Sequence, residues 1–343
     1  MVTMHTARLR IAAIVLVAAV AVAGAPAQTT LTGQAAMKFL SIGVGARAAG
    51  LGYSFSTYRD DISTIFWNPA GVATLGGTRV FVDMNQWISD IQQYSFAVSH
   101  AFGEIGVVGL SFTTMDYGDI PGTAIELSAV GSGSFEYVET GQVKVANYAV
   151  GLTYARAISG QFSVGAQVKY VYSGLGSNTI NQPSGQETID NTASTLAFDV
   201  GTTFDTGFRE LIFSMSVRNV SRQIRYPRMS QGFYLPLVFT LGASIDVIDL
   251  VDPESTVHSL VFAVNGLHPT DYLEKACFGL EYAYDMQWFL RAGYKINYSV
   301  EDFSFGLGAR IPFAGGETLQ FDYAYCLMKY FSGVQRLSLS VVL

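Results

Sequence analysis

The sequence predicts an all-β protein, a transmembrane antiparallel β-barrel of about fourteen strands. The chain is 50% apolar, but beyond residue 27 it has no run of 18 apolar residues, so a membrane-spanning helix is excluded. From residue 78 onward, apolar and polar residues alternate in the manner of strands. Only 14% of the residues are charged, against about a quarter in a soluble protein. A barrel reconciles these features, because lipid contacts only every second residue of each strand.

Residues 1–27 are expected to be a secretory signal peptide. Arg8 and Arg10 form a basic start, residues 11–22 are apolar, and Ala25-Pro26-Ala27 resembles a small-residue cleavage site. The apolar run is too short to span a membrane. An exported barrel predicts localisation in the outer membrane of a Gram-negative-type envelope.

Fourteen segments between residues 78 and 343 alternate in this way. In residues 302–312, for example, Phe303, Phe305 and Leu307 alternate with serine and glycine. The predicted strands are 78–87, 91–101, 105–115, 143–157, 161–174, 193–205, 210–219, 235–248, 256–265, 275–285, 287–298, 302–312, 317–329 and 334–343. An even count places both ends of this barrel domain, 78–343, on the periplasmic side.

The connections between these strands also favour a membrane barrel. The three longest, 116–142, 175–192 and 220–234, all fall on the side predicted to face outward, and most connections on the other side are short. The alternative is a soluble protein whose two sheets hide their apolar faces against each other. That alternative gives no reason for sorted loops, nor for the aromatic ends of the outward rows, such as Trp288, Tyr294 and Tyr298.

The inward face of the predicted barrel is polar and carries both signs of charge. The predicted lumen-facing charges are Asp83, Lys169, Asp199, Arg218, Glu281, Arg291, Lys295, Arg310, Asp322 and Arg336. Two interpretations remain open. These groups line a water path or a ligand-binding lumen, or they form ion pairs that hold a filled interior together, since buried charges are rarely left unpaired.

Residues 28–77 do not alternate, and they are too short for a domain with its own core. We expect them to form a hatch or plug inside or beneath the barrel. The glycines Gly43, Gly45, Gly50 and Gly52 imitate a phosphate-binding loop, but the lysine and hydroxyl residue of that motif are missing. These hatch glycines are instead expected to let the backbone lie against the barrel wall.

Asp60 and Asp61 are either a metal or acid–base pair or the N-cap of a short helix over residues 62–67. No histidine lies near them in the sequence, so the cap is the preferred interpretation, with Asn68 capping a second turn that begins at Pro69. We expect no metal, no cofactor and no enzyme activity, because no catalytic constellation appears. Cys277 and Cys326 are expected to be isolated, and the net charge of −7 argues against a nucleic-acid partner.

Two N-terminal stretches carry a resemblance to a known family. The run 39–52, the acidic pair at 60–61, and Trp67 followed by Asn68, Pro69, Ala70 and Gly71 resemble the N-terminal signature of PorV/PorQ outer-membrane proteins. Residues 335–340 are similar to the last strand of that family. The wider relatives are FadL-like transporters, whose hatch carries an Asn-Pro-Ala motif, so the resemblance implies that Asn68, Pro69, Ala70 and Gly71 form a hatch motif.

The resemblance implies a function as well as a fold. A PorV/PorQ-type barrel would handle secreted protein cargo, recognised by C-terminal signal domains, together with a type IX translocon barrel. The alternative is a FadL-like channel for hydrophobic small molecules such as long-chain fatty acids. Such a channel releases its substrate sideways into the outer-membrane lipids, through a kinked wall strand beside the hatch.

Overall fold

The structure is a computed structural model that describes residues 33–127, 135–182, 185–313 and 316–343. The predicted signal peptide, residues 1–27, lies outside the described residues. Among the described residues, no helix is long and apolar enough to cross a bilayer.

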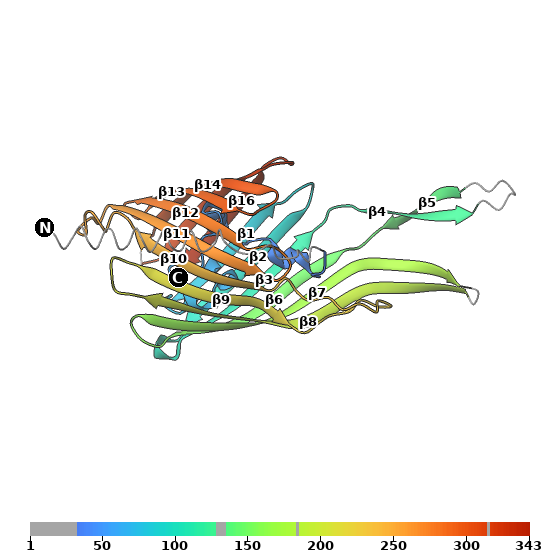
Figure 1. The fold of residues 1–343 in the computed structure, drawn as a ribbon, viewed down its shortest axis with the longest axis horizontal. Helices are drawn as coiled ribbons and strands as arrows, with labels where there is room; N and C mark the ends of the chain where they lie inside the picture. The colour runs from blue at the N-terminus through green and yellow to red at the C-terminus, as the bar shows by residue number, and fades with distance from the viewer. Residues whose placement is uncertain (1–32, 128–134, 183–184, 314–315) are drawn as a thin grey trace.

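Fourteen antiparallel strands form one closed barrel, which confirms the predicted fold class (Figure 1). The barrel strands are β1 (Thr78–Gln86), β2 (Gln92–Ala101), β3 (Val107–Asp116), β6 (Ala146–Ala157), β7 (Phe162–Gln182), β8 (Gly185–Asp205), β9 (Ile212–Ser221), β10 (Val238–Asp246), β11 (His258–Pro269), β12 (Lys275–Tyr284), β13 (Trp288–Ile296), β14 (Glu301–Pro312), β15 (Thr318–Met328) and β16 (Val334–Val342). The first and last strands close the barrel, with Arg79 opposite Val342 and Gln86 opposite Gln335. Closure removes the free sheet edges that a membrane does not tolerate.

The outer face of the barrel wall is apolar and the inner face is polar, as the alternation predicted. On β13, Trp288, Leu290 and Tyr294 are exposed on the outer face, whereas Arg291 and Lys295 are buried on the inner face. The same alternation of exposed and buried residues runs along β16 and β3. An apolar outer face with a polar inner face is the pattern of a lipid-embedded barrel.

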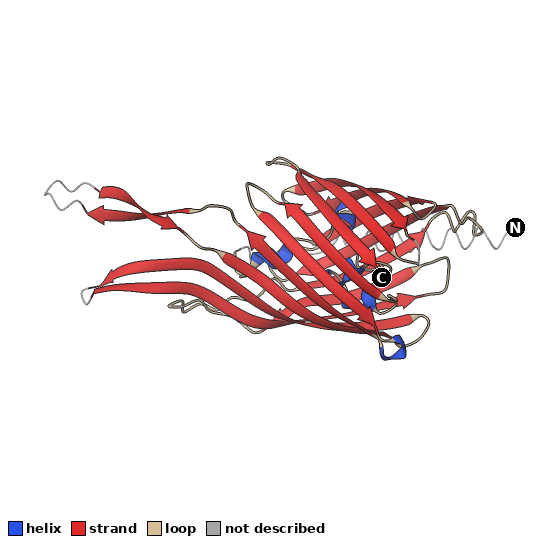
Figure 2. Ribbon diagram, turned by 180° about the vertical axis from the view of Figure 1, so that it is seen from behind, coloured by secondary structure: helices blue, strands red, loops and turns tan. Residues whose placement is uncertain are grey.

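One end of the barrel carries long projections, and we call it the hairpin end (Figure 2). Strands β4 (Pro121–Leu127) and β5 (Phe135–Gln142) form a separate two-stranded sheet there. Strands β7 and β8 continue beyond the barrel as a paired ribbon. The prediction of loops over 116–142 and 175–192 was therefore wrong for most of their length. A ribbon without a lipid-facing side needs no alternation of apolar and polar residues, so the sequence of these strands does not show the pattern from which strands were predicted.

The opposite end, the turn end, has mostly short connections. The barrel also closes there, since Leu343 donates its amide to the carbonyl of Thr78 over 2.8 Å. Residues 158–161 and 206–211 make two of these turns. The predicted sorting of long and short connections to opposite ends is present in the structure.

Residues 33–77, which we call the interior segment, run through the barrel as a chain of short helices. They are η1 (Lys38–Ser41), α2 (Ala46–Gly50), η2 (Ile62–Phe66) and η3 (Pro69–Val72), while a further helix, η4 (Gly103–Ile105), lies in a turn of the wall. The core of the molecule lies between the segment and the wall. Leu51 and Phe55 belong to one buried hydrophobic cluster with the wall residues Ala263 and Ala324. Ile65 belongs to another cluster with Val107 of β3.

Candidate functional site

Two side-chain caps shape the interior segment, as the sequence predicted. The Asp61 carboxylate accepts the Ser63 amide over 2.8 Å at the start of η2. The Asn68 carbonyl oxygen accepts the Ala70 amide over 3.1 Å at the start of η3, where Pro69 is the first helical residue. Both caps satisfy amides that the first turn of a helix leaves free.

The predicted hatch-motif residues lie against strands β7 and β8. The Asn68 amide nitrogen donates to the carbonyls of Ser56 and Thr202, at 2.9 and 3.1 Å. A Cβ built on the wall residue Gly201 would lie 1.9 Å from the Asn68 carbonyl oxygen, and one on Gly165 would lie 2.4 Å from the Pro69 carbonyl carbon. Ala70 and Gly71 are also buried. Asn68 therefore ties the segment to itself and to the wall.

Two of the four predicted hatch glycines lie against the wall. A Cβ on Gly50 would lie 3.0 Å from the Gly306 Cα, and one on Gly52 would lie 2.9 Å from the Tyr294 amide. The other two have different surroundings. Gly43 faces the rings of Tyr53 and Trp67, and Gly45 has a φ of 95° with no atom closer than 3.5 Å to a built Cβ.

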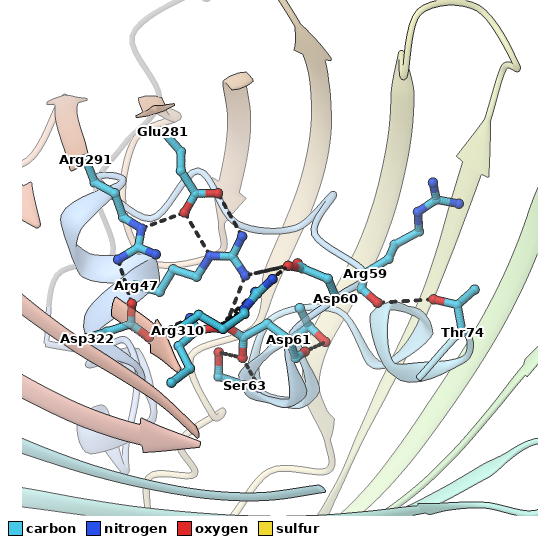
Figure 3. A network of polar contacts seen from close by, with 12 residues as sticks. Arg47, Arg59, Asp60, Asp61, Ser63, Thr74, Glu281, Arg291, Arg310 and Asp322 are labelled. Atoms are coloured by element: carbon cyan, nitrogen blue, oxygen red, sulfur yellow. Dashed lines mark hydrogen bonds and ion pairs between the residues drawn. The ribbon is translucent and has the colours of Figure 1, made fainter. Parts of the chain in front are cut away.

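A buried ion-pair network joins the interior segment to β12–β15 (Figure 3). The Arg47 guanidinium donates to both oxygens of Glu281, at 2.9 and 2.7 Å, and to Asp60 at 3.0 Å. Arg291 donates to the same Glu281 at 2.6 Å and to Asp322 at 2.7 Å. Arg310 reaches Asp60 at 3.2 Å.

Opposite charges in this network compensate one another. Burial disfavours the ionised form of Asp60, but Arg47 and Arg310 outweigh it and hold the pKa of that carboxyl well below its ordinary value. Removing one member of such a network leaves a buried charge without its partner, which is strongly destabilising. On this side of the lumen the charges fasten the segment to the wall, which favours the ion-pair interpretation there.

A second polar cluster lies in the wall at β7–β9. Lys169 and Asp199 form an ion pair at 2.7 Å, and Asp199 also accepts the Asn219 amide at 2.7 Å, where the pairing of β8 and β9 shifts register. Arg218 donates to the Phe66 carbonyl at 2.8 Å, and its guanidinium carbon lies 5.1 Å from the centre of the Trp67 ring.

The remaining predicted charges also lie inside the barrel. Asp83 accepts the Ser338 hydroxyl at 2.7 Å. Arg336 donates to the Tyr53 hydroxyl at 2.7 Å and to the Gly43 carbonyl. Lys295 pairs with Glu301, and its ammonium lies 3.5 Å from the centre of the Tyr53 ring.

Three cavities border the interior segment in the described part of the chain. The largest, about 460 Å³, opens at the hairpin end, and we call it the hairpin-end cavity. The inner cavity, about 50 Å³, lies beside β7–β9 and shares Phe39, Leu40, Ile42, Gly43, Arg218 and Asn219 with the first. The turn-end cavity, about 170 Å³, lies on the other side of the segment and is lined by Asp60, Arg79 and Arg310.

Lateral release predicts a kinked wall strand beside the hatch, whose motif lies against β7 and β8. β3 pairs with β2 and with β6 without a register shift. Shifts occur elsewhere in the described barrel, between β7 and β8, between β8 and β9, and between β14 and β15. The shift between β8 and β9, at Phe198 and Val200, lies next to Gly201, which faces Asn68, so β8 is an irregular wall strand beside the hatch motif.

The comparisons with known proteins define the family. A sequence model described as uncharacterised protein family UPF0164 matches residues 13–225. The chain belongs to the UPF0164 family. No curated protein matches this UPF0164 member. The PorV/PorQ resemblance is a different assignment, which this match does not support.

Solved structures resemble this UPF0164 protein over most of its length. They include the monoaromatic hydrocarbon channel CymD, with 12% identity, a TM-score of 0.54 and coverage of 87% of this chain and 96% of that one. The Ralstonia pickettii toluene transporter TbuX has 13% identity, a TM-score of 0.55 and coverage of 87% and 97%. A Pseudomonas aeruginosa FadL homologue has 12% identity, a TM-score of 0.53 and coverage of 88% and 98%. At these identities the likeness establishes the fold, a FadL-like barrel.

Sequence reasoning missed several residues of the site. Arg47 was interpreted only as one residue of the glycine- and alanine-rich run 43–52. A single cation in such a run indicates a buried acidic partner, because buried charges are rarely left unpaired. Trp87, Tyr272 and Tyr298 line the hairpin-end cavity from connections between strands. Trp87 and Tyr298 were assigned to the ends of the predicted strands 78–87 and 287–298, but β1 ends at Gln86 and β13 at Ile296, so both side chains turn into the cavity.

Proposed function

We propose that this protein is an outer-membrane channel that takes up small hydrophobic molecules from outside the cell. The hairpin-end cavity carries the proposal. It combines apolar and aromatic side chains, including Phe39, Leu40, Met115 and Trp87, with a few polar groups. Concave, mostly apolar sites with few polar groups are typical of small-molecule binding.

The fold and the sorting of its connections agree with this role, because short periplasmic turns and long outer loops are usual in such barrels. The hairpin end would then face outward, and the interior segment would act as a hatch below the cavity. Structures with the same fold are named as a toluene transporter and a monoaromatic hydrocarbon channel, not as enzymes. These names support transport of hydrophobic molecules by this chain.

The route past the hatch would follow the side away from the ion-pair network. Arg47 and Glu281 fasten the segment to β12–β15, whereas the hairpin-end and inner cavities share Phe39, Leu40 and Ile42. A shift of that stretch would join the two cavities without breaking the network.

An uptake assay tests the proposal. Cells of a Gram-negative host without a channel of this fold would make the protein or an unrelated barrel, with the outer membrane left intact. We expect faster uptake of labelled toluene or a labelled long-chain fatty acid in cells that make this protein. Equal uptake of both compounds in the two strains would refute the proposal.

Handling of type IX cargo is the second candidate. It rests on the N-terminal motif around Asn68 and on the projecting strands β4–β5 and β7–β8, which offer a surface for a protein partner. Neither the family match nor the structural neighbours support it. Affinity purification from the native envelope tests this role. Recovery of a translocon barrel, or of secreted proteins with a shared C-terminal domain, would favour it. Recovery of neither would reject it.

A further inference from the structure

The hairpin-end cavity has a charge imbalance that a purely hydrocarbon ligand does not explain. Three cations, Lys38, Arg218 and Lys275, and two acids, Asp271 and Glu301, line it. Both acids already have partners, because Asp271 pairs with Lys38 and Glu301 pairs with Lys295. Among the described residues, no carboxylate lies within ion-pair distance of Arg218 or Lys275.

Arg218 occupies the floor of this cavity. Its guanidinium borders both the hairpin-end and the inner cavity. One N–H donates to the Phe66 carbonyl at 2.8 Å, while Nε has no hydrogen-bond partner among the described residues. A guanidinium has several donors in a fork that matches a carboxylate, so Arg218 has donors to spare.

Lys275 occupies the mouth of the cavity at the start of β12. Its ammonium lies 4.3 Å from the centre of the Tyr298 ring and 4.7 Å from that of Tyr272. Ring faces stabilise a cation only modestly. Lys275 can therefore turn toward an incoming anion at little cost.

The rest of the lining is rich in rings. Seven of its residues are aromatic, and they come from the interior segment, the wall and the connections at the hairpin end: Phe39, Tyr53, Trp67, Trp87, Tyr117, Tyr272 and Tyr298. Aromatic rings pack well against other rings, edge to face or offset. The cavity thus combines a ring-lined body with, at each end, a cation that makes no direct ion pair in the described part of the chain.

We infer that the hairpin-end cavity selects an aromatic monocarboxylate, with Arg218 binding the carboxylate at the floor and Lys275 drawing the anion in at the mouth. This inference rests on the proposed function and names the substrate class of the same cavity. A neutral hydrocarbon would leave both cations without a direct ion pair. The aromatic acid supplies that partner and keeps its ring among the aromatic side chains.

Calorimetry on the purified protein in a neutral detergent tests the inference. The probes are 2-naphthoate, its uncharged analogue 2-naphthalenemethanol, and dodecanoate, all at pH 8. We expect 2-naphthoate to bind at least about tenfold more tightly than the alcohol, since hydrogen bonds to a charged group are stronger than those between neutral groups. It should also bind more tightly than dodecanoate.

Variants locate the effect. Arg218→Met should lower the affinity for 2-naphthoate about tenfold and leave that for the alcohol unchanged, and Arg218→Lys should restore part of the loss. Lys275→Met should mainly slow association. Lys329→Met is the matched control, because Lys329 pairs with Asp302 at the same end and lines none of the three cavities. The heat-dependent gel shift of each variant checks that it is folded.

Each other outcome has a definite meaning. Equal affinities for 2-naphthoate and the alcohol, or no effect of either Arg218 substitution in folded protein, overturn the carboxylate subsite. Dodecanoate binding as tightly as 2-naphthoate overturns the preference for a ring. If the uptake assay succeeds while these tests fail, the channel stands and only the substrate class is wrong.

Discussion

Single residues decide how closely the interior segment approaches the barrel wall. Glycines on both partners meet where the contact is tightest, as at Gly52 and Gly293. A Cβ on Gly293 would lie 2.0 Å from the Gly52 amide nitrogen. Backbone cannot move aside as a flexible side chain can, so these positions accept no larger residue without a shift of the whole segment.

Gly293→Ala should therefore destabilise the protein by about 3 kcal/mol, at the upper end of the range for overpacking. Gly266→Ala is the matched control, because a Cβ on that wall glycine would meet nothing within 4 Å. Urea unfolding in detergent, followed by tryptophan fluorescence, measures both. A Gly293→Ala protein as stable as the control would mean that the contact between Gly52 and Gly293 is looser than the structure indicates.

At the scale of elements, the ion-pair network determines which part of the interior segment is fixed. Glu281 on β12 lies between two guanidiniums and holds α2 through Arg47. Glu281→Gln removes the charge that both cations share, so we expect a loss of about 3 kcal/mol. Proteolysis within residues 46–66 should become faster, as the segment leaves the wall more often.

The control for that substitution is Glu274→Gln, since its carboxylate pairs near the surface with His268 and with no other described side chain. Such exposed pairs contribute about 1 kcal/mol or less. If Glu281→Gln and Glu274→Gln give the same proteolysis rate, the network does not hold the segment.

The same network should make the attachment of the interior segment to the wall weaker at low pH. The pKa of Asp60 is lowered in the folded protein by Arg47 and Arg310, against the effect of burial. A carboxyl with a depressed pKa stabilises the fold above its unfolded value of about 4 and loses that contribution as the pH falls further. Because the Asp60 side chain is 46% exposed, solvent screening moderates the effect.

Trp67 reports on this docking when Trp87 and Trp288 are replaced by phenylalanine. Its emission should stay constant from pH 7 to about pH 4 and shift to the red only at lower pH. In an Asp60→Asn protein the acid transition should be weaker. A red shift between pH 7 and pH 5 would show that groups other than this carboxyl control docking.

Sequence patterns predicted these elements unevenly, for physical reasons. The strands were readable because lipid on one side forces alternation, and the caps at Asp61 and Asn68 were readable because capping is local. The ribbon of β7 and β8 beyond the barrel has no lipid-facing side and was read as a loop. The partners of Arg47 depend on where the segment crosses the barrel, which no local pattern records.

At the level of the whole molecule, the interior of the barrel is filled on the side of β12–β15 and contains cavities on the opposite side. The segment is fastened to β12–β15 and separates the hairpin-end cavity from the turn-end cavity. The family match and the FadL-like fold fit this arrangement, but the cavity itself was beyond prediction. Its lining comes from connections and from the segment, whose packing depends on the whole fold.

Binding of hydrophobic molecules in the hairpin-end cavity is what the proposed transport depends on. A crystal structure grown with 6-bromo-2-naphthoate tests it most directly, through the anomalous signal of bromine. We predict a bromine peak inside the cavity, among Phe39, Trp87 and Tyr298, with the carboxylate toward Arg218. A peak found only on the lipid-facing surface, for example beside Trp288, would contradict the claim.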